Sequence, residues 1–454
     1  MSKILHRDLK KDPLLVSKGE GSYFYLPDST KILDAAGGAA VTSVGHSNKE
    51  VTDKICDSIQ NIQFVHSSLF TTDSAEKLAS TILDDPKYQS LGFSKVAFYN
   101  SGSEANETAL KLARQAFYEK GALQRTKVIS RDLSYHGNTF GAMSLSGHKI
   151  RNKKFIDMQD PKTFLKVCPP FYRNFHISGE TEEQFCDRLI KELDDKFQEA
   201  GPENVICFFA ETMIGGTLGC VMPPKNYFER AKEICEKYGA LLIYDEIMCG
   251  SGRLGSFFAW EQLTDEDNWD KVSPHISTFG KAIGSGYMPL SGVVVHKKVV
   301  DILKEGSGLS LSRHTYQSHP VACAAGLAVQ EYIRSNNLLA NIRNLGPKLG
   351  DLLKQELLGL EVVADVRGHG FFWCVEFLKS KEPMEAFDPS VEFSEIVGDT
   401  CLANGLTVIP CHGCVDGFLG DHILISPSFD ITEEIVTEIV TILKKSVLEA
   451  MTKI

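Results

Sequence analysis

Residues 238–255 read YGALLIYDEIMCGSGRLG, and this stretch decides the fold that the sequence predicts. Its run Ala240–Tyr244 is apolar at every position, as expected of a strand that is buried on both faces of a parallel sheet. Two acids, Asp245 and Glu246, follow directly. Ligands bind at the carboxyl ends of parallel strands, and neighbouring side chains of a strand point to opposite faces. We therefore expect only one of the two acids to face a ligand site.

Similar apolar runs alternate with helical patterns along much of the chain, as in residues 104–117, where apolar side chains recur at helical spacing. This alternation is typical of an α/β fold with a mostly parallel sheet. After about Val321 helices dominate and short strand-like pieces follow, which indicates a smaller α+β lobe. The other expected elements are the large-sheet strands Lys95–Tyr99, Thr126–Ser130, Val205–Ala210 and Gly292–Val295, the strand-like pieces Tyr23–Leu26, Ile32–Asp34, 371–377 and 423–425, and a final helix from about Thr432.

Length and composition limit the classes of protein. At about 150 residues per domain, 454 residues predict two or three domains. A formal net charge of −11 disfavours nucleic acid as a partner, because an acidic surface repels phosphates. No apolar run approaches the roughly 20 residues that span a bilayer, so we expect no membrane partner. Residues 1–15 lack a secretory signal and include Asp8 and Asp12, which are unusual in a mitochondrial transit peptide. We expect a cytoplasmic protein and leave a mitochondrial one open.

Twelve cysteines are scattered through the chain, which is typical of free thiols in a reducing compartment. Cys411 and Cys414 form a CxxC pair with His412 between them. Zinc needs about four ligands, and the sequence has no second pair at suitable spacing. A redox CxxC usually opens a helix, whereas Gly-rich sequence follows here. We interpret the pair as part of a structured loop and expect no metal.

The segment Asn100–Ala105, NSGSEA, follows a predicted strand and opens a predicted helix. The first N–H groups of a helix lack partners and its N-terminal end is positive, so such a place binds phosphate well. Gly102 permits close approach of the backbone, and Ser101 and Ser103 offer hydroxyl groups. The alternative is that the serines only cap the helix.

Lys281 stands in STFGKAIGSG, residues 277–286, after a strand and among glycines. A single lysine of this kind is usually a solvated surface residue, and the alternative is a nucleophile that forms a Schiff base. The order of segments favours the second interpretation. A phosphate cup at Gly102, a YHG triplet at 135–137 and an acid at a strand end precede Lys281 along the chain, and together they predict a cofactor site.

These segments resemble the class III (subgroup II, fold type I) aminotransferases, the omega-transaminase-like enzymes that use pyridoxal 5′-phosphate (PLP), and the likeness covers nearly the whole chain. It implies a PLP-dependent transferase fold with a large, mostly parallel, seven-stranded sheet domain and a smaller α+β domain. We expect residues 1–75 to join the small domain, 76–322 to form the PLP-binding domain, and 323–454 to form the small domain. The matching segments are SGSEANETALKLAR (101–114), SYHGNTFGAMSLSG (134–147), AET (210–212), YGALLIYDEIMCGSGRLGSFFAWE (238–261), STFGKAIGSG (277–286), RHTYQSHPVACAAGLA (313–328) and VRGHGFFWCVEF (366–377).

The resemblance implies a role for each matching residue. Lys281 resembles the lysine that forms an aldimine with PLP and moves the proton during transfer. Asp245 resembles the acid that keeps the pyridine nitrogen protonated, and Glu211 matches a further acid near cofactor and substrate. These three are the catalytic candidates. The cofactor-binding candidates are Ser101, Gly102 and Ser103 at the phosphate, Tyr135 and Ile247 on the two ring faces, His136, Asp245, Lys281, and Thr315, which matches a threonine that reaches the phosphate of the other subunit in a homodimer.

The chain departs from many relatives where the substrate binds. Relatives that use α-keto acids often keep an arginine in the C-terminal lobe for the α-carboxylate, but residues 404–430 contain no Arg and no Lys. Small residues, Ala39 and Ala40, stand near a position that is bulky in many amine transaminases. Both departures predict a roomier, less basic pocket. The substrate-binding candidates are Tyr25, Ala40, Arg367 and His412, with Arg253 as a further cation, although Arg367 also fits a structural role.

The resemblance therefore implies ping-pong transfer of an amino group from an amine or ω-amino acid to a keto acid, with pyruvate as the expected acceptor. Racemases, a mutase and a decarboxylase of the same family share the lysine, the acid and the cup, so they stay alternatives. A catalytically inactive binding protein of this fold is disfavoured, because such proteins usually lose the lysine or the aspartate.

Overall fold

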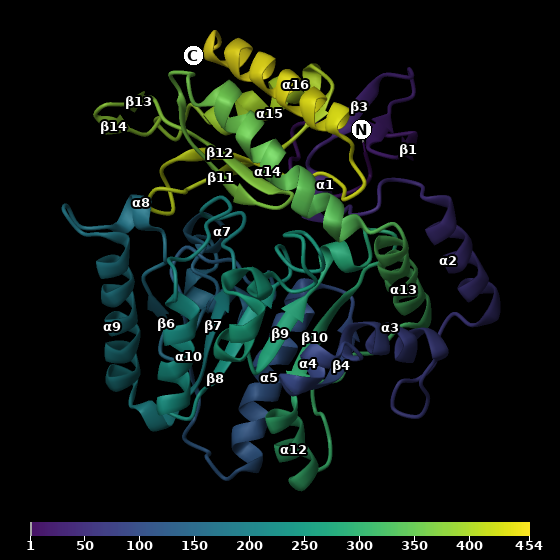
Figure 1. Ribbon diagram of the computed structural model, residues 1–454, viewed down its shortest axis with the longest axis vertical. Coiled ribbons are helices and arrows are strands. Elements are labelled where there is room, and N and C mark those ends of the chain that lie inside the picture. Colours follow the sequence, from purple (N-terminus) through teal and green to yellow (C-terminus); the bar gives the residue numbers. More distant parts are fainter. Residues whose placement is uncertain (1) are drawn as a thin grey trace.

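The computed structural model describes residues 2–454, and a seven-stranded sheet forms the centre of its larger lobe (Figure 1). The strand order is β4-β10-β9-β8-β7-β5-β6. Strand β10 runs antiparallel to both neighbours and the other adjacent pairs are parallel, which confirms the predicted sheet. The strands are β4 (Phe93–Tyr99), β5 (Lys127–Arg131), β6 (Phe164–Val167), β7 (Val205–Glu211), β8 (Leu241–Glu246), β9 (Ile276–Phe279) and β10 (Ser291–His296).

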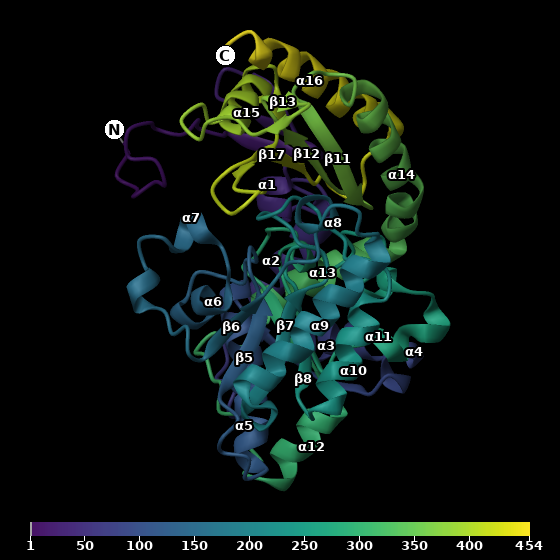
Figure 2. The same ribbon diagram turned by 90° about the vertical axis from the view of Figure 1, so that its left-hand side faces the viewer.

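Helices cover both faces of this sheet, so β7 and β8 are buried along their whole length. One face packs against α5 and α12, and the other against α3, α9 and α10 (Figure 2). This two-sided burial explains why ALLIY shows no alternation of polar and apolar residues. The helices of this lobe are α3 (Asp73–Leu83), α4 (Pro86–Ser90), α5 (Gly102–Glu119), α6 (Phe140–Leu145), α7 (Lys149–Asn152), α8 (Tyr172–Phe175), α9 (Glu182–Ala200), α10 (Tyr227–Lys237), α11 (Trp269–Val272) and α12 (Lys297–Glu305).

The smaller lobe, uppermost in Figure 1, contains both ends of the chain. Its antiparallel sheet has the order β11-β12-β17-β16, and a second sheet joins the N-terminal strands β1, β2 and β3 to β15 from the C-terminal part. Its elements, with the adjoining α2 and α13, are β1 (Lys18–Glu20), β2 (Tyr23–Tyr25), β3 (Lys31–Asp34), α1 (Gly37–Ala40), α2 (Lys49–Asn61), α13 (Pro320–Ser335), α14 (Leu338–Leu357), β11 (Val363–His369), β12 (Phe372–Phe377), β13 (Ser380–Lys381), β14 (Met384–Glu385), α15 (Phe393–Ala403), β15 (Leu406–Thr407), β16 (Ile409–His412), β17 (Asp421–Ile425) and α16 (Glu433–Met451).

The predicted domain boundaries, after residues 75 and 322, both fall in the first turn of a helix, α3 and α13. The division of the chain into three segments therefore stays a prediction. The last helix begins as expected, with the side chain of Thr432 accepting the N–H of Ile435. All twelve cysteines are free thiols. Among residues 2–454 the structure has no helix that is both long and apolar enough to cross a bilayer.

Candidate active site

Asp245 lies near the end of β8 with only 4% of its surface exposed, and three groups contact its carboxylate. Oδ2 accepts a hydrogen bond from Asn106 Nδ2 at 2.8 Å and lies 2.7 Å from His136 Nδ1. Oδ1 accepts the backbone N–H of Ile247 at 2.9 Å. A buried carboxylate needs such partners, because an unpaired one costs several kcal/mol.

Glu246 uses its carboxylate elsewhere, in agreement with the expectation that one acid alone faces the site. It accepts hydrogen bonds from Thr212 Oγ1 at 2.9 Å and from the backbone N–H groups of Ala259 and Trp260, both at 2.7 Å. Burial raises the pKa of Glu246 to about 8. This acid anchors the loop around residues 259–260 rather than a ligand.

Asn106, from α5, joins the carboxylate of Asp245 to two neighbouring segments. Its Nδ2 also donates to the carbonyl of His136 at 2.6 Å, and its Oδ1 accepts Thr278 Oγ1 from β9 at 2.7 Å. His136 Nε2 is buried and has no hydrogen-bond partner within residues 2–454. Side chains from a helix, a loop and an adjacent strand therefore hold Asp245 in place.

Lys281 follows β9 and Gly280, at the same carboxyl edge of the sheet. Because β8 and β9 are adjacent and parallel, Lys281 and Asp245 leave the sheet side by side. The backbone of Lys281 has φ of 47°, in the left-handed region that few non-glycine residues adopt. Loss of water around the ammonium group lowers the pKa of Lys281 to about 8, although Asp245 and Glu211 oppose the shift. The amine is therefore partly neutral near pH 8 and able to act as a nucleophile or base.

The N-terminus of α5 faces the same edge, and the structure shows the capping role that its sequence allows. Ser101 caps the helix, since its Oγ accepts the N–H of Glu104 at 3.3 Å, and its carbonyl accepts the N–H of Ala105. The first helical N–H groups, those of Gly102 and Ser103, have no intrahelical partner. They lie at the positive end of an 18-residue helix, and such a place suits an anion, so we refer to it as the anion cup.

Ile247 lies between this cup and the lysine. A Cβ on Gly102 would lie 2.7 Å from Ile247 Cγ2, and one on Gly280 would lie 3.1 Å from Ile247 Cδ1. Glycine is needed at residue 102 for this close approach, because a larger residue would displace the isoleucine. The apolar side chain thus borders the space between cup and amine.

Glu211, at the end of β7, contacts the segment that carries Tyr135. Glu211 Oε1 accepts the backbone N–H of Tyr135 at 3.1 Å, Oε2 accepts that of Gly215 at 3.2 Å, and burial raises the pKa of Glu211. The half-buried ring of Tyr135 meets the ring of His148 edge-on, with centroids 6.1 Å apart. The guanidinium carbon of Arg151 lies over the Tyr135 ring, 4.8 Å from its centroid.

Comparisons with known proteins point to one family. The model of the class III aminotransferase family matches residues 5–447. The chain belongs to the class III aminotransferases. It is 37% identical to an aminotransferase of Schizosaccharomyces pombe over 96% of this chain and 92% of that protein. It is 32% identical to gamma aminobutyrate transaminase 2 of Solanum lycopersicum over 96% and 91% of the two chains. A PMP-bound aminotransferase crystal structure from Vibrio fluvialis matches with a TM-score of 0.87 at 27% identity, over 98% of this chain and 94% of that one.

Class III aminotransferases use PLP, so this aminotransferase is a PLP-dependent enzyme, as predicted. The residues at the sheet edge fit that group. The free N–H groups of Gly102 and Ser103 suit its phosphate, the carboxylate of Asp245 suits its protonated pyridine nitrogen, and the amine of Lys281 suits its aldehyde carbon.

The arginines proposed for substrate binding are committed to protein contacts. In Arg367, Nε donates to the carbonyl of Gly219 at 2.6 Å, Nη1 donates to Asp365 at 2.8 Å and Glu376 at 2.6 Å, and Nη2 donates to the carbonyl of Leu218 at 2.5 Å. These contacts favour the structural role over contact with a substrate.

Arg253 is completely buried and joins both ends of the chain to the large lobe. Nη2 donates to the carbonyls of Thr42 at 2.9 Å and Ala40 at 3.3 Å, and Nη1 donates to that of Pro427. The guanidinium also lies over the ring of Phe429, 4.7 Å from its centroid. Burial lowers the pKa of Arg253 to about 9. Its Nη1 and Nη2 donate to backbone carbonyls and its Nε is buried, so a substrate carboxylate has no access to the guanidinium.

The two histidines of residues 404–430 offer no available cation either. His412 lies between carboxylates, with Nδ1 3.1 Å from Asp421 and Nε2 3.2 Å from Glu395, and these hydrogen bonds raise its pKa to about 9. Its positive charge is thus already matched. Burial lowers the pKa of His422 to about 3 and keeps it neutral.

The remaining sequence candidates are Ala40, Tyr25 and Thr315, and none of them contacts Asp245 or Lys281 through a hydrogen bond in residues 2–454. Ala40 is fully buried in an apolar cluster, whereas Ala39 is exposed, so Ala39 is the better placed of the two for a substrate. Tyr25 is half-buried in β2, with Lys18 Nζ 5.6 Å from the centroid of its ring. Thr315 is exposed in the loop between α12 and α13.

Sequence reasoning missed two buried polar side chains, Asn106 and Thr278, that support Asp245. The signal for Asn106 was an amide on the otherwise apolar face of an amphipathic helix, where an unsatisfied polar group would be costly. The signal for Thr278 was weaker, since threonine is common in strands. Arg151, beside Tyr135, was also missed.

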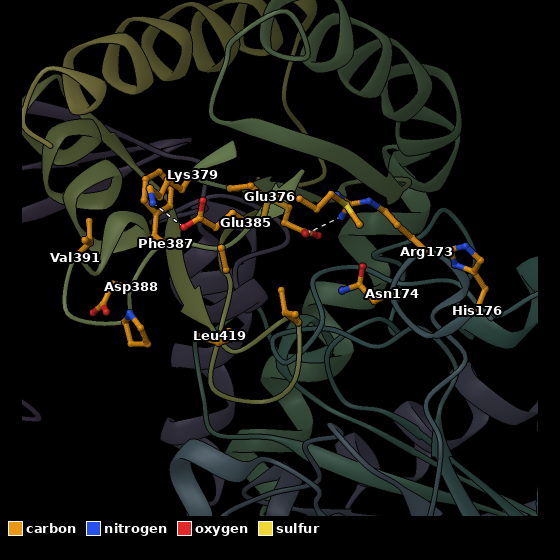
Figure 3. A pocket seen from close by; sticks show the side chains of 15 residues that line it. Arg173, Asn174, His176, Glu376, Lys379, Glu385, Phe387, Asp388, Val391 and Leu419 are labelled. Carbon is orange, nitrogen blue, oxygen red and sulfur yellow. Dashed lines mark hydrogen bonds and ion pairs between the residues drawn. The ribbon is translucent and has the colours of Figure 1, made fainter. Parts of the chain in front are cut away.

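A separate cavity of about 910 Å³ lies between α8 and the strands β12 to β14 (Figure 3). Arg173 reaches across it from α8 to the buried Glu376, 2.7 Å away, and Lys379 pairs with Glu385 at 2.6 Å. The residues lining it include neither Asp245 nor Lys281. The pair of Arg173 and Glu376 joins the two lobes, and we assign the cavity no chemistry.

The contacts of His412 predict a pH dependence of stability. Its pKa is raised from 6.5 to about 9 in the folded protein, so its contribution is complete below pH 6.5 and is lost as the pH rises through 9. At 1.36 kcal/mol per unit the shift is worth at most about 3 kcal/mol, and we expect about 1–2 because the side chain is partly exposed. In urea denaturation at pH 6 and pH 10, the wild type should lose that much more stability than His412→Gln. Equal losses in the two proteins would contradict the assignment.

Proposed function

We propose that the aminotransferase moves an amino group from an amine or ω-amino acid to a keto acid by a ping-pong mechanism, with pyruvate preferred to 2-oxoglutarate. The observation that carries the proposal is the meeting of Lys281, Asp245 and the free N–H groups of Gly102 and Ser103 at one sheet edge. Bound PLP supplies a carrier for the amino group and withdraws electrons from the substrate carbon.

Lys281 is the residue proposed to hold the cofactor covalently and then to move the proton. Its pKa of about 8 leaves Nζ partly neutral at physiological pH, and a neutral amine is able to take a proton from the substrate carbon. The buried surroundings that lower the pKa also keep bulk water from competing for that proton.

Asp245 is proposed to accept a hydrogen bond from the pyridine N–H of the cofactor. A carboxylate offers about four acceptor positions, and Asn106, His136 and the N–H of Ile247 occupy three of them. A fourth is left for a ring nitrogen, and the negative charge favours its protonated form. Tyr135 and Ile247 are proposed to pack on the two faces of the ring, and His136 to orient the acid. Glu211, held through Tyr135 and Gly215, is proposed to lie near the reacting groups.

The proposed preference for pyruvate follows from the small number of positively charged side chains that are free to bind a carboxylate. Arg253, Arg367 and His412 are engaged with protein groups, so the pocket has few positive charges for carboxylates. A substrate with one carboxylate needs one cation, whereas 2-oxoglutarate needs two, and an unpaired carboxylate is costly to desolvate. The same argument favours donors without a carboxylate beside the reacting carbon.

A homodimer is proposed because exposed apolar side chains gather beside Thr315. Phe64, Leu69 and Phe70 are exposed in one segment, and Leu311 and Tyr316 in another. The rings of Phe64 and Tyr316 lie 5.9 Å apart, so the two segments form one surface. Contiguous exposed apolar surface is typical of an interface.

A substrate panel tests the proposed reaction. Medium-chain amines and ω-amino acids should transfer their nitrogen, and kcat/KM for pyruvate should exceed that for 2-oxoglutarate by about tenfold or more, since each 1.36 kcal/mol is a factor of ten. Lys281→Ala should abolish turnover, and borohydride should fix the cofactor to the wild type only. A preference for 2-oxoglutarate would contradict the acceptor assignment, and labelling of Lys281→Ala would contradict the role of the lysine.

Asp245→Asn should lower kcat on the order of 10³-fold, about 4 kcal/mol in the barrier, because a neutral amide no longer favours the protonated ring nitrogen. Glu246→Gln is the matched control. Glu246 is adjacent and equally buried, its pKa of about 8 keeps it largely neutral at pH 7, and its contacts lie away from the site. If both variants kept near-normal kcat, Asp245 would have no part in the chemistry.

The dimer should be seen by sedimentation at assay concentration, with an interface above roughly 2,000 Å² as in obligate pairs. Thr315→Ala should leave the dimer intact and weaken cofactor retention on dilution, because the phosphate would lose a hydroxyl donor from the other subunit. A fully active monomer would refute this assignment.

A further inference from the structure

A keto acid or an ω-amino acid brings a carboxylate into a pocket whose nearby cations are already committed. Arg253 holds backbone carbonyls, Arg367 pairs with Asp365 and Glu376, and His412 lies between two acids. Each of them would have to break contacts with the protein to bind a substrate. A positive group with unused donors is therefore required beside the site.

Arg151, on the short helix α7, has such donors. Its guanidinium carbon lies 4.8 Å from the centroid of the Tyr135 ring, and the side chain is exposed. Within residues 2–454 no hydrogen bond or ion pair holds the guanidinium of Arg151, whereas Arg253 donates to backbone carbonyls and Arg367 pairs with two acids. An arginine held over an aromatic face keeps its N–H groups, which lie in its own plane, free for an anion.

The helix α7 is fastened on both sides of Arg151. Lys149 Nζ donates to the carbonyl of Asp416 at 2.8 Å, which ties the helix to the loop after β16. Asn152 is buried, and its Nδ2 donates to the carbonyl of Met143 at 3.1 Å. The backbone around Arg151 is thus fixed by its neighbours, while its own side chain is left to face Tyr135.

The charges near Arg151 leave it unmatched. Glu211 accepts the N–H groups of Tyr135 and Gly215, and Asp245 has its own partners. Burial, with Arg151 as the second cause, lowers the pKa of His148 to about 4, so this neighbour is neutral at pH 7 and adds no cation. Arg151 also contributes to the lowered pKa of Lys281, as expected of a positive charge that lies near the reacting amine.

We propose that Arg151 binds the carboxylate of the keto-acid acceptor and of ω-amino acid donors, and so determines which substrates the enzyme takes. The planar guanidinium matches a carboxylate with two parallel hydrogen bonds, and stacking on Tyr135 positions it at the mouth of the site. A single guanidinium binds a single carboxylate. The inference rests on the proposed function and supplies the cation that residues 404–430 lack.

Three variants of the holoenzyme test the proposal. Arg151→Gln removes the charge and the fork, Arg151→Lys keeps the charge alone, and Lys153→Gln removes an exposed charge two residues further along as a matched control. Each is assayed for KM and kcat with pyruvate, and for the half-reaction with butylamine, which has no carboxylate. Binding of butanoate, an unreactive carboxylate, is measured by calorimetry and does not depend on turnover.

Arg151→Gln should raise KM for pyruvate and Kd for butanoate by tenfold or more, while the butylamine half-reaction stays within twofold of wild type. Arg151→Lys should lie between the two, and Lys153→Gln should match the wild type. An equal loss with butylamine would mean that Arg151 only supports Tyr135 and would overturn the proposal, as would unchanged butanoate binding. If instead the wild type bound butanoate through Arg151 but transferred no nitrogen, the proposed function alone would fail.

Discussion

The carboxylate of Asp245 is almost completely buried at the end of a parallel strand, and that burial is tolerable only with several polar partners. Meeting this requirement brings together segments that are distant in sequence. Asn106 comes from the first turns of α5, His136 from the loop after β5, and Thr278 supports Asn106 from β9. The same elements carry the anion cup and lead into Lys281. The strand order β9-β8-β7 then sets Lys281, Asp245 and Glu211 at three neighbouring strand ends, so one buried acid organises the whole edge of the sheet.

The two lobes meet through arginines that serve the fold. Arg253 binds carbonyls from both ends of the chain, and Arg367 connects β11 to the loop after β7. Arg173 bridges from α8 to the buried Glu376. The guanidinium groups at this junction donate to backbone carbonyls or pair with acids. The region between the lobes therefore offers few free positive charges. An active site built at such a junction gains shape from both lobes, but any substrate-binding charge has to come from a side chain that the contacts of the junction have not already used.

The sequence predicted those elements in which local pattern and burial agree. The unbroken run before Asp245 is β8, the NSGSEA segment opens α5 from its cap at Ser101, and the final helix begins after Thr432. Strand β6 was missed because it has only four residues and carries a polar side chain, Lys166, whereas β9 was expected before Lys281 but without bounds. Motifs singled out the residues proposed for the phosphate cup, the acid and the lysine, and the structure places them at one edge of the sheet. Motifs could not predict whether the N–H groups of an arginine are free to bind a substrate. Those of Arg253 donate to the carbonyls of residues 40, 42 and 427, which are far away in sequence.

The backbone of Lys281 is in the left-handed region. Glycine adopts this conformation freely, whereas other residues adopt it at a cost of about 1 kcal/mol or more. Mutation to glycine would relieve that cost and, at the same time, delete the amine. Stability of the backbone and the chemistry proposed for Lys281 therefore favour different residues at this position. A laboratory screen that rewarded stability alone would therefore favour glycine at residue 281 and so remove the amine.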